Sequence, residues 1–211
     1  ITEYFKEDYT DIIYEIKKDS IMFLINYEEY SKNSVNAKIL ELYDHISTLV
    51  HTFRDMDTTV CISSAVDSPS KVWEIKKQVR DAEWSRMHYG LNKIIFWTQS
   101  IEDAQGTAEK KLEPIIKNTS LAISSLNSNK FSTCLNEFYS LSPNILISRA
   151  ARTFIRQTIS QVFQAYWDMI ASFTDPTECY DTLSYCLHLC TSFSQHRRTL
   201  LRQCTELMER I

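Results

Sequence analysis

The chain has 211 residues, of which 44% are hydrophobic and 24% charged, so it has the length and apolar content to bury a core. Its formal net charge of −4 argues against non-specific nucleic-acid binding as the main activity. The two glycines form no GxGxxG, GxxxxGK(S/T) or GxSxG pattern, so the dinucleotide-binding, P-loop and α/β-hydrolase classes lack their signatures.

Apolar residues recur every three or four positions along most of the chain, which is the spacing of helices that bury one face. The first stripe predicts one long helix over residues 2–31. After it, Asn33 or Ser34 can cap a second helix, which we expect to end at about Asp57.

Residues 58–70 lose this period and are expected to form a loop, at whose end Ser68 and Pro69 make a cap and first-turn pair. A third helix is predicted over residues 69–104, with apolar stripes on two nearly opposite sides. One of these stripes contains Trp73, Lys77, Arg80 and Trp84. A helix of this kind is either enclosed in a core or offers one side to a partner, and both interpretations stay open.

Gly106 is expected to separate this helix from a weaker one that contains Pro114. A short helix is predicted over about residues 134–141. The Ser-Pro pair at 142–143 then opens a long apolar stripe that ends near Phe173.

The clearest local signal is the sequence TDPTE. Asp175 is the expected cap, Pro176 takes the first helical position, and Glu178 completes a capping box. The last helix is therefore predicted over residues 176–211.

Long helices with short connections bury their stripes by lying alongside one another. The predicted fold class is all-α, an elongated antiparallel bundle of six or seven long helices, or two bundles in series. We expect a single helical domain over residues 1–211, with 1–105 and 107–211 as candidate sub-bundles.

The segment SYCLHLC, residues 184–190, has the residue types of a metal site or a disulfide, but its spacing fits neither. On a helix Cys186 and Cys190 share a face while His188 points about 200° away. A disulfide between cysteines four residues apart would strain the helix. We therefore interpret both cysteines, together with Cys204, as small buried hydrophobic residues.

Six cysteines are below the density of a disulfide scaffold, which favours a reducing, cytoplasmic setting. The sequence leaves open whether Cys61, Cys134 or Cys179 is oxidised.

No pattern of catalytic residues is found in the sequence. The five histidines are scattered without an HExxH motif, and the adjacent carboxylates Glu28 and Glu29 point in diverging directions. The paired Glu-x-x-His motifs of di-iron bundles do not occur. We expect no catalytic residue, no cofactor, no metal ion and no enzymatic activity.

Arginines are candidate partner-binding residues, because the guanidinium group makes paired hydrogen bonds with carboxylates or phosphates. One group on a shared helix face is Arg149, Arg152 and Arg156. A second group is Arg197, Arg198 and Arg202, together with His196. The alternative is that these arginines pair with acidic residues of the same molecule.

These residue types, with the tryptophan stripe, are typical of protein–protein contacts. We expect a non-enzymatic helical scaffold or adaptor domain within a larger complex, whose partner is another protein offering a helical or peptide segment. No nucleic-acid partner is expected. No apolar run approaches the roughly 20 residues of a membrane span, so no transmembrane segment is expected.

The run AYWDMIASFTDPTECY, residues 165–180, resembles a segment near the C-terminus of one subunit of the conserved oligomeric Golgi tether. The matching residues are Ala165, Tyr166, Asp175, Pro176 and Tyr180. The resemblance implies, as the alternative function, a helical-rod subunit of a vesicle-tethering assembly at Golgi membranes.

Overall fold

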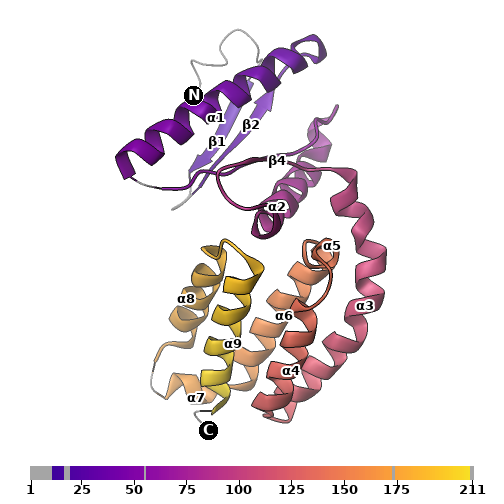
Figure 1. Cartoon of the computed structure of the whole chain (residues 1–211), viewed down its shortest axis with the longest axis vertical. Coiled ribbons are helices and arrows are strands. Elements are labelled where there is room, and N and C mark those ends of the chain that lie inside the picture. The colour runs from indigo at the N-terminus through magenta and orange to yellow at the C-terminus, as the bar shows by residue number, and fades with distance from the viewer. Residues whose placement is uncertain (1–10, 17–19, 55, 173, 210–211) are drawn as a thin grey trace. The chain divides into compact units, whose positions relative to one another are not determined.

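The computed structural model describes residues 11–16, 20–54, 56–172 and 174–209. Internal contacts divide the chain into two compact units, residues 1–60 and 61–211. Within the described residues there are nine α-helices and two short two-stranded sheets (Figure 1), so the prediction of a mostly helical chain is confirmed. The helices range from 4 to 26 residues. Many are shorter than predicted, because several of the predicted long helices are each divided into two or three.

The first unit begins with an antiparallel hairpin of β1 (Asp11–Ile16) and β2 (Ile21–Asn26). Tyr14 lies opposite Phe23, with 6.3 Å between the ring centroids. The predicted helix over residues 2–31 is therefore wrong for the described part of that range, whereas residues 1–10 and 17–19 lie outside the described residues. The β-branched and aromatic side chains of these two segments favour paired strands, and β2 is a short continuous apolar run, which fits a strand as well as a helix.

The helix of this unit is α1 (Lys32–Arg54), which follows the 3₁₀ turn η2 (Glu29–Ser31). It agrees with the predicted second helix to within about three residues at each end. Val35 is 2% exposed near its start, and the apolar stripe farther along the helix is half-buried.

The second unit begins with a small α/β segment. β3 (Val60–Ile62), at the junction of the two units, pairs with β4 (Ile94–Phe96), and η3 (Pro69–Lys71) leads into α2 (Val72–Tyr89). The predicted cap is confirmed, since Ser68 accepts a hydrogen bond from the backbone N–H of Ser70.

The predicted helix over residues 69–104 ends early, at Tyr89. Gly90 has φ 91° and ψ 178°, and its N–H donates to the carbonyl oxygen of Arg86. Glycine reaches such positive φ values without steric cost and therefore ends helices. The chain then forms a strand before it returns to a helix.

The longest helix, α3 (Gln99–Ser124), runs through Gly106 and contains Pro114 in its interior. The boundary between sub-bundles expected near residue 106 therefore falls inside a helix, whereas the two compact units meet at residues 60 and 61. An isolated glycine costs a helix only about 1 kcal/mol, so it does not by itself end one.

The next segments are α4 (Ser128–Tyr139), α5 (Pro143–Leu146), α6 (Arg149–Ala165) and α7 (Trp167–Ala171). The stripe predicted as one helix from residue 142 to 173 is thus three helices. The first break is at Ser148, which caps α6 by accepting the N–H of Ala151 at 3.1 Å. The second break is at Tyr166, whose backbone leaves helical geometry.

The predicted last helix is two helices, α8 (Pro176–His188) and α9 (Phe193–Glu209). The cap at Asp175 is confirmed, since its Oδ1 accepts the N–H of Thr177 at 2.8 Å. The break at residues 189–192 is stabilised by Gln195, whose Oε1 accepts from the backbone N–H of Thr191 at 3.0 Å.

One hydrophobic core joins the helices of the second unit. α3 packs against α4 and α6, α4 packs against α9, and α9 packs against α8 (Figure 1). The largest fully buried side chains of this core include Phe131, Phe138, Phe154, Tyr166 and Leu200. This core sets the relative positions of α6, α7 and α8.

Candidate functional site

An open groove of about 330 Å³ lies between α6, the start of α7 and α8. It is lined by Ser160, Phe163, Gln164, Trp167, Thr177 and Tyr180. Three of the six lining side chains are large aromatic rings, and none carries a charge. The groove can therefore bind an apolar side chain.

The bend after α6 places Trp167 in the groove. Tyr166 has φ −113° and ψ 12°, which ends the regular helix, and its own side chain is buried with 2% exposed. Trp167, the next residue, is 46% exposed. Adjacent residues on a helix point about 100° apart, so one ring enters the core while the next one lines the groove.

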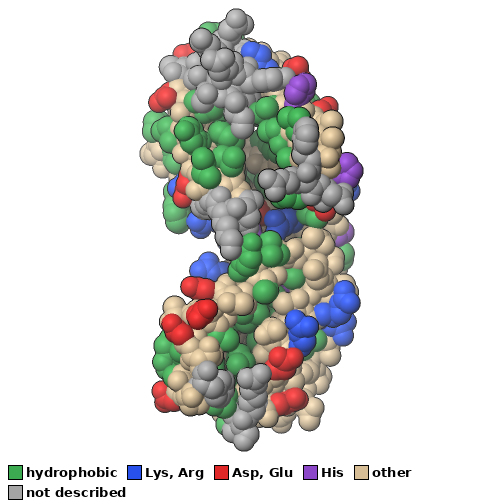
Figure 2. Space-filling view, turned by 90° about the vertical axis from the view of Figure 1, so that its left-hand side faces the viewer, with side chains coloured by type: hydrophobic (Ala, Val, Ile, Leu, Met, Phe, Trp, Pro, Cys, Tyr) green, Lys and Arg blue, Asp and Glu red, His purple; other side chains and the backbone are tan. Residues whose placement is uncertain are grey.

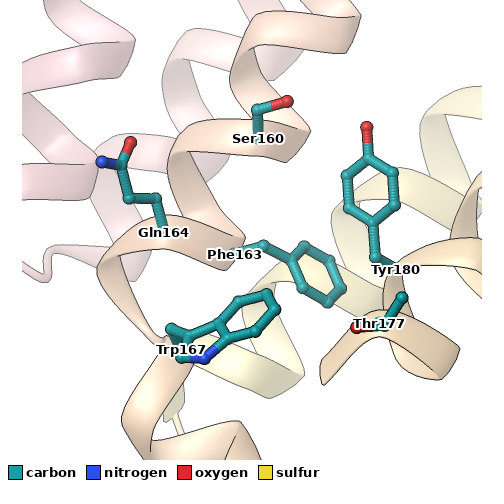
Figure 3. A pocket seen from close by; sticks show the side chains of 6 residues that line it. All are labelled: Ser160, Phe163, Gln164, Trp167, Thr177 and Tyr180. Atoms are coloured by element: carbon teal, nitrogen blue, oxygen red, sulfur yellow. The ribbon is translucent and has the colours of Figure 1, made fainter. Parts of the chain in front are cut away.

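Phe163 and Tyr180 connect the two walls. Their ring centroids are 5.3 Å apart at 86°, an edge-to-face arrangement that aromatic pairs prefer. In Figure 3, Phe163 and Trp167 project from one wall and Tyr180 stands on the other, while the amide of Gln164 points away from the rings. The capped start of α8 fixes Thr177 and Tyr180 in this position.

Three exposed acidic residues are sequence neighbours of groove residues. Asp168 directly follows Trp167, Glu178 follows Thr177, and Asp181 follows Tyr180. Negative charge on these turns of α7 and α8 favours a positively charged occupant over a negatively charged one.

Trp84 of the predicted tryptophan stripe lies inside the second unit. Its indole N–H donates to the carbonyl oxygen of Leu146 at 2.7 Å, and its ring meets Phe193 and His196 edge-on at centroid distances of 5.9 and 5.4 Å. Trp73 on the same helix is 64% exposed. The stripe therefore passes from the surface into the core along α2, so the two tryptophans do not form one exposed face.

Arg149 and Arg152 both pair with Asp81, a carboxylate that is 3% exposed. Arg149 Nη2 lies 2.6 Å from Asp81 Oδ2, and Arg152 Nη2 lies 2.8 Å from Asp81 Oδ1. Burial lowers the pKa of Arg152, and the charge of Asp81 partly offsets this. These two arginines make the intramolecular pairing that was the alternative to partner binding, and they connect α6 to α2.

The other predicted site residues lie at or near the surface. Arg197 donates from Nε to Asn136 Oδ1 at 2.9 Å, which connects α9 to α4. The exposed members of the predicted set are Arg80, Arg156, Arg197, Arg198 and Arg202, and Lys77 is half-buried. On the face drawn in Figure 2, Lys and Arg side chains form a group beside Asp and Glu side chains.

The cysteine interpretation is partly confirmed. Cys190 is 1% exposed and Cys204 is fully buried, whereas Cys186 is exposed. Cys186 and Cys190 do not share a helix face, because α8 ends at His188 and the chain turns before Cys190. Burial raises the pKa of Cys204 to about 12. All six cysteines are free thiols in the structure, Cys61, Cys134 and Cys179 among them.

A buried pair of titratable side chains was not found from the sequence. Tyr139 Oη and His196 Nδ1 are 2.5 Å apart, and His196 is 2% exposed. Burial lowers the pKa of His196 to about 4 and raises the pKa of Tyr139 well above its ordinary value. Both groups are therefore neutral near pH 7, and a hydrogen bond joins the hydroxyl of Tyr139 to the ring nitrogen of His196.

Comparison with known proteins finds no matching family model, no matching curated protein and no matching solved structure. Among the described residues, no group of three or more His, Cys, Asp or Glu side chains is placed to hold a metal ion. No helix in that part of the chain is both long and apolar enough to cross a membrane.

Proposed function

We propose that the chain is a non-enzymatic scaffold or adaptor domain that binds a segment of another protein within a larger complex. The observation that supports this most is the aromatic groove between α6 and α8, where Trp167 remains 46% exposed beside the buried core. Tryptophan and tyrosine at an open groove are the residue types that contribute most to protein–protein binding.

The charge at the groove indicates the kind of segment. The exposed residues Asp168, Glu178 and Asp181 each follow a residue of the uncharged, largely aromatic lining in the sequence. A helix or peptide with one or two large apolar side chains, flanked by lysine or arginine, would bury its apolar residues against Trp167 and Tyr180.

Site-specific photo-crosslinking tests this proposal. A benzophenone amino acid replaces Ser160, an exposed groove residue, and the full chain is expressed in its native cells and irradiated. The proposal predicts a small set of protein adducts whose crosslinked peptides carry basic and apolar residues. The same amino acid at Thr133, an exposed position on α4, is the control and should give none of these adducts.

Two exposed tryptophans allow the groove to be compared with the face predicted from the sequence. Trp167→Ala should remove the Ser160 adducts, whereas Trp73→Ala should leave them. If Trp73→Ala removes them and Trp167→Ala does not, the α2 surface around Trp73, Lys77 and Arg80 is the binding face instead.

The tethering alternative rests on residues 165–180, which include Trp167, Thr177 and Tyr180 of the groove. The same crosslinking experiment tests it, because a tether subunit would give adducts with other helical-rod subunits of one assembly. The cytoplasmic setting is part of the proposal, and fractionation of the same cells tests it.

A further inference from the structure

A small cavity of about 50 Å³ lies near the start of α6, apart from the groove. It is lined by Glu74, Lys77 and Gln78 of α2, by Trp97 just after β4, and by Arg149 at the first position of α6. All five residues belong to the second unit. Unlike the groove, this cavity is polar.

Two hydrogen-bond donors at this cavity are unsatisfied. Trp97 Nε1 and Arg149 Nε are both buried and have no hydrogen-bond partner, although Arg149 Nη2 is bonded to Asp81. Leaving a buried donor unsatisfied costs about 1–3 kcal/mol, and native proteins rarely do so. An acceptor in the cavity would satisfy both groups.

The remaining polar side chain supplies a further donor rather than an acceptor. Gln78 Oε1 already accepts from the backbone N–H of Ser64 at 3.0 Å and from its hydroxyl at 2.7 Å. The side-chain NH₂ of Gln78 is therefore the part of this amide that remains to donate.

The local charge favours an anion over water. Among the lining residues, Lys77 and Arg149 carry two positive charges and Glu74 carries one negative charge, and the adjoining pair of Asp81 and Arg152 adds one charge of each sign. The lining therefore has an excess of one positive charge, and Arg149 stands at the N-terminal end of α6, where the helix dipole also favours negative charge.

We propose that this cavity binds one small inorganic anion of the size of chloride. The anion accepts hydrogen bonds from Trp97 Nε1 and Arg149 Nε, and Lys77 balances its charge. A water molecule needs roughly 10–15 Å³ of such space, so the cavity is large enough for a monatomic anion and too small for most organic ligands.

Thermal unfolding of the full chain tests the proposal, with sodium chloride exchanged for sodium gluconate at constant ionic strength. A bound anion stabilises only the folded state, so Tm should rise with the logarithm of the chloride concentration once this exceeds the Kd. At a tenfold excess of chloride over its Kd, the expected rise is about 3–6 °C.

Trp97→Phe keeps the ring and removes the N–H, so it should abolish the chloride-dependent rise. Trp167→Phe makes the same chemical change in the groove and should leave the rise intact. No chloride-specific rise in the wild-type chain, or an equal rise in Trp97→Phe, would overturn the proposal and indicate that water fills the cavity.

Glu74→Gln provides a second test that does not depend on the folding of Trp97→Phe. It removes a negative charge from the cavity and should tighten chloride binding severalfold, so the Tm rise at a given chloride concentration should be larger than in the wild-type chain. An unchanged or smaller Tm rise contradicts the anion site.

Discussion

Trp84 and Leu146 are joined by a hydrogen bond of 2.7 Å from the indole N–H to the backbone carbonyl oxygen. This bond connects α2 to α5 across 62 positions of sequence. It explains why a tryptophan that shares a helical stripe with the exposed Trp73 is itself part of the packed interior.

The first prediction concerns this bond. Trp84→Phe keeps an aromatic ring but leaves the carbonyl oxygen of Leu146 without its donor, so the free energy of unfolding should fall by about 1–3 kcal/mol. Urea unfolding followed by circular dichroism measures the change. Trp73→Phe at the exposed position should change it by less than about 0.5 kcal/mol, and equal effects of the two variants would contradict the buried placement of Trp84.

The second prediction compares a buried ion pair with an exposed one. Asp81→Asn leaves Arg149 and Arg152 without their shared counter-charge, and should lower the free energy of unfolding by about 2–4 kcal/mol. Asp67→Asn breaks a pair of similar length with Lys71, but Asp67 is 81% exposed, so solvent screens this pair and the effect should be much smaller. Urea unfolding measures both, and the account is wrong if Asp67 contributes as much as Asp81.

The third prediction is a pH dependence caused by His196. Its pKa is about 4 in the folded chain and near 6.5 when unfolded, so the unfolded chain takes up the proton first as the pH falls. The contribution of His196 to stability is therefore fully present above about pH 6.5 and is lost as the pH falls to about 4. The size of the loss is about 3 kcal/mol.

Unfolding free energies between pH 7 and pH 4 measure this effect as a slope. His196→Gln removes the titrating group, so its slope should be shallower than that of the wild-type chain, whatever its absolute stability. Thr133→Ala, at an exposed position on α4, removes no titrating group, so it is the control and should keep the wild-type slope. Identical slopes in the wild-type chain and His196→Gln would show that His196 is not buried in its neutral form.

The fourth prediction concerns two residues with positive φ. Gly90→Ala places a side chain at φ 91° and ψ 178°, which should lower the free energy of unfolding by about 1–3 kcal/mol. The nearest atom to the added Cβ is Lys93 Nζ at 4.0 Å, so the effect comes from the backbone and not from a clash. Leu126 has φ 53° and is 50% exposed, so Leu126→Gly should raise the free energy of unfolding by about 0.5–1 kcal/mol. Effects of the same sign would contradict this conformational assignment.

Helix starts were predictable from the sequence where a cap and a proline occur together. Asp175 with Pro176, and Ser68 with Pro69, begin helical segments at the expected positions. These signals are local, since they depend on one side chain and the fixed φ of proline.

Breaks within apolar stripes were harder to predict, although one signal was present. Ser192 and Gln195 have the spacing of a capping box, and Ser192 Oγ accepts the N–H of Gln195 at 3.2 Å at the start of α9. The apolar period continued across this point, so the stripe from residue 176 onward was interpreted as one helix. Periodicity identifies which residues are buried, but it does not show whether the helix between them is continuous.

The hairpin was missed because its residues fit two periods. Ile12 and Ile16 are four residues apart. On a helix this spacing places both on one face, and on a strand, where every second residue shares a face, it also places both on one face. Only the pairing of β1 with β2 decides between these, and the apolar spacing within either segment does not show that pairing.

The groove was missed for a related reason. The exposure of Trp167 follows from the bend at Tyr166, which no glycine or proline marks, and its partner Tyr180 comes from another helix.

The central claim is that the groove between α6 and α8 binds a protein segment, and isothermal titration calorimetry tests it most directly. The segment identified by crosslinking at Ser160 is titrated into the wild-type chain, Trp167→Ala and Trp73→Ala. The account predicts that Trp167→Ala weakens binding by about 30-fold or more, as for a central aromatic contact, while Trp73→Ala stays within twofold. Wild-type affinity in a folded Trp167→Ala chain would contradict it.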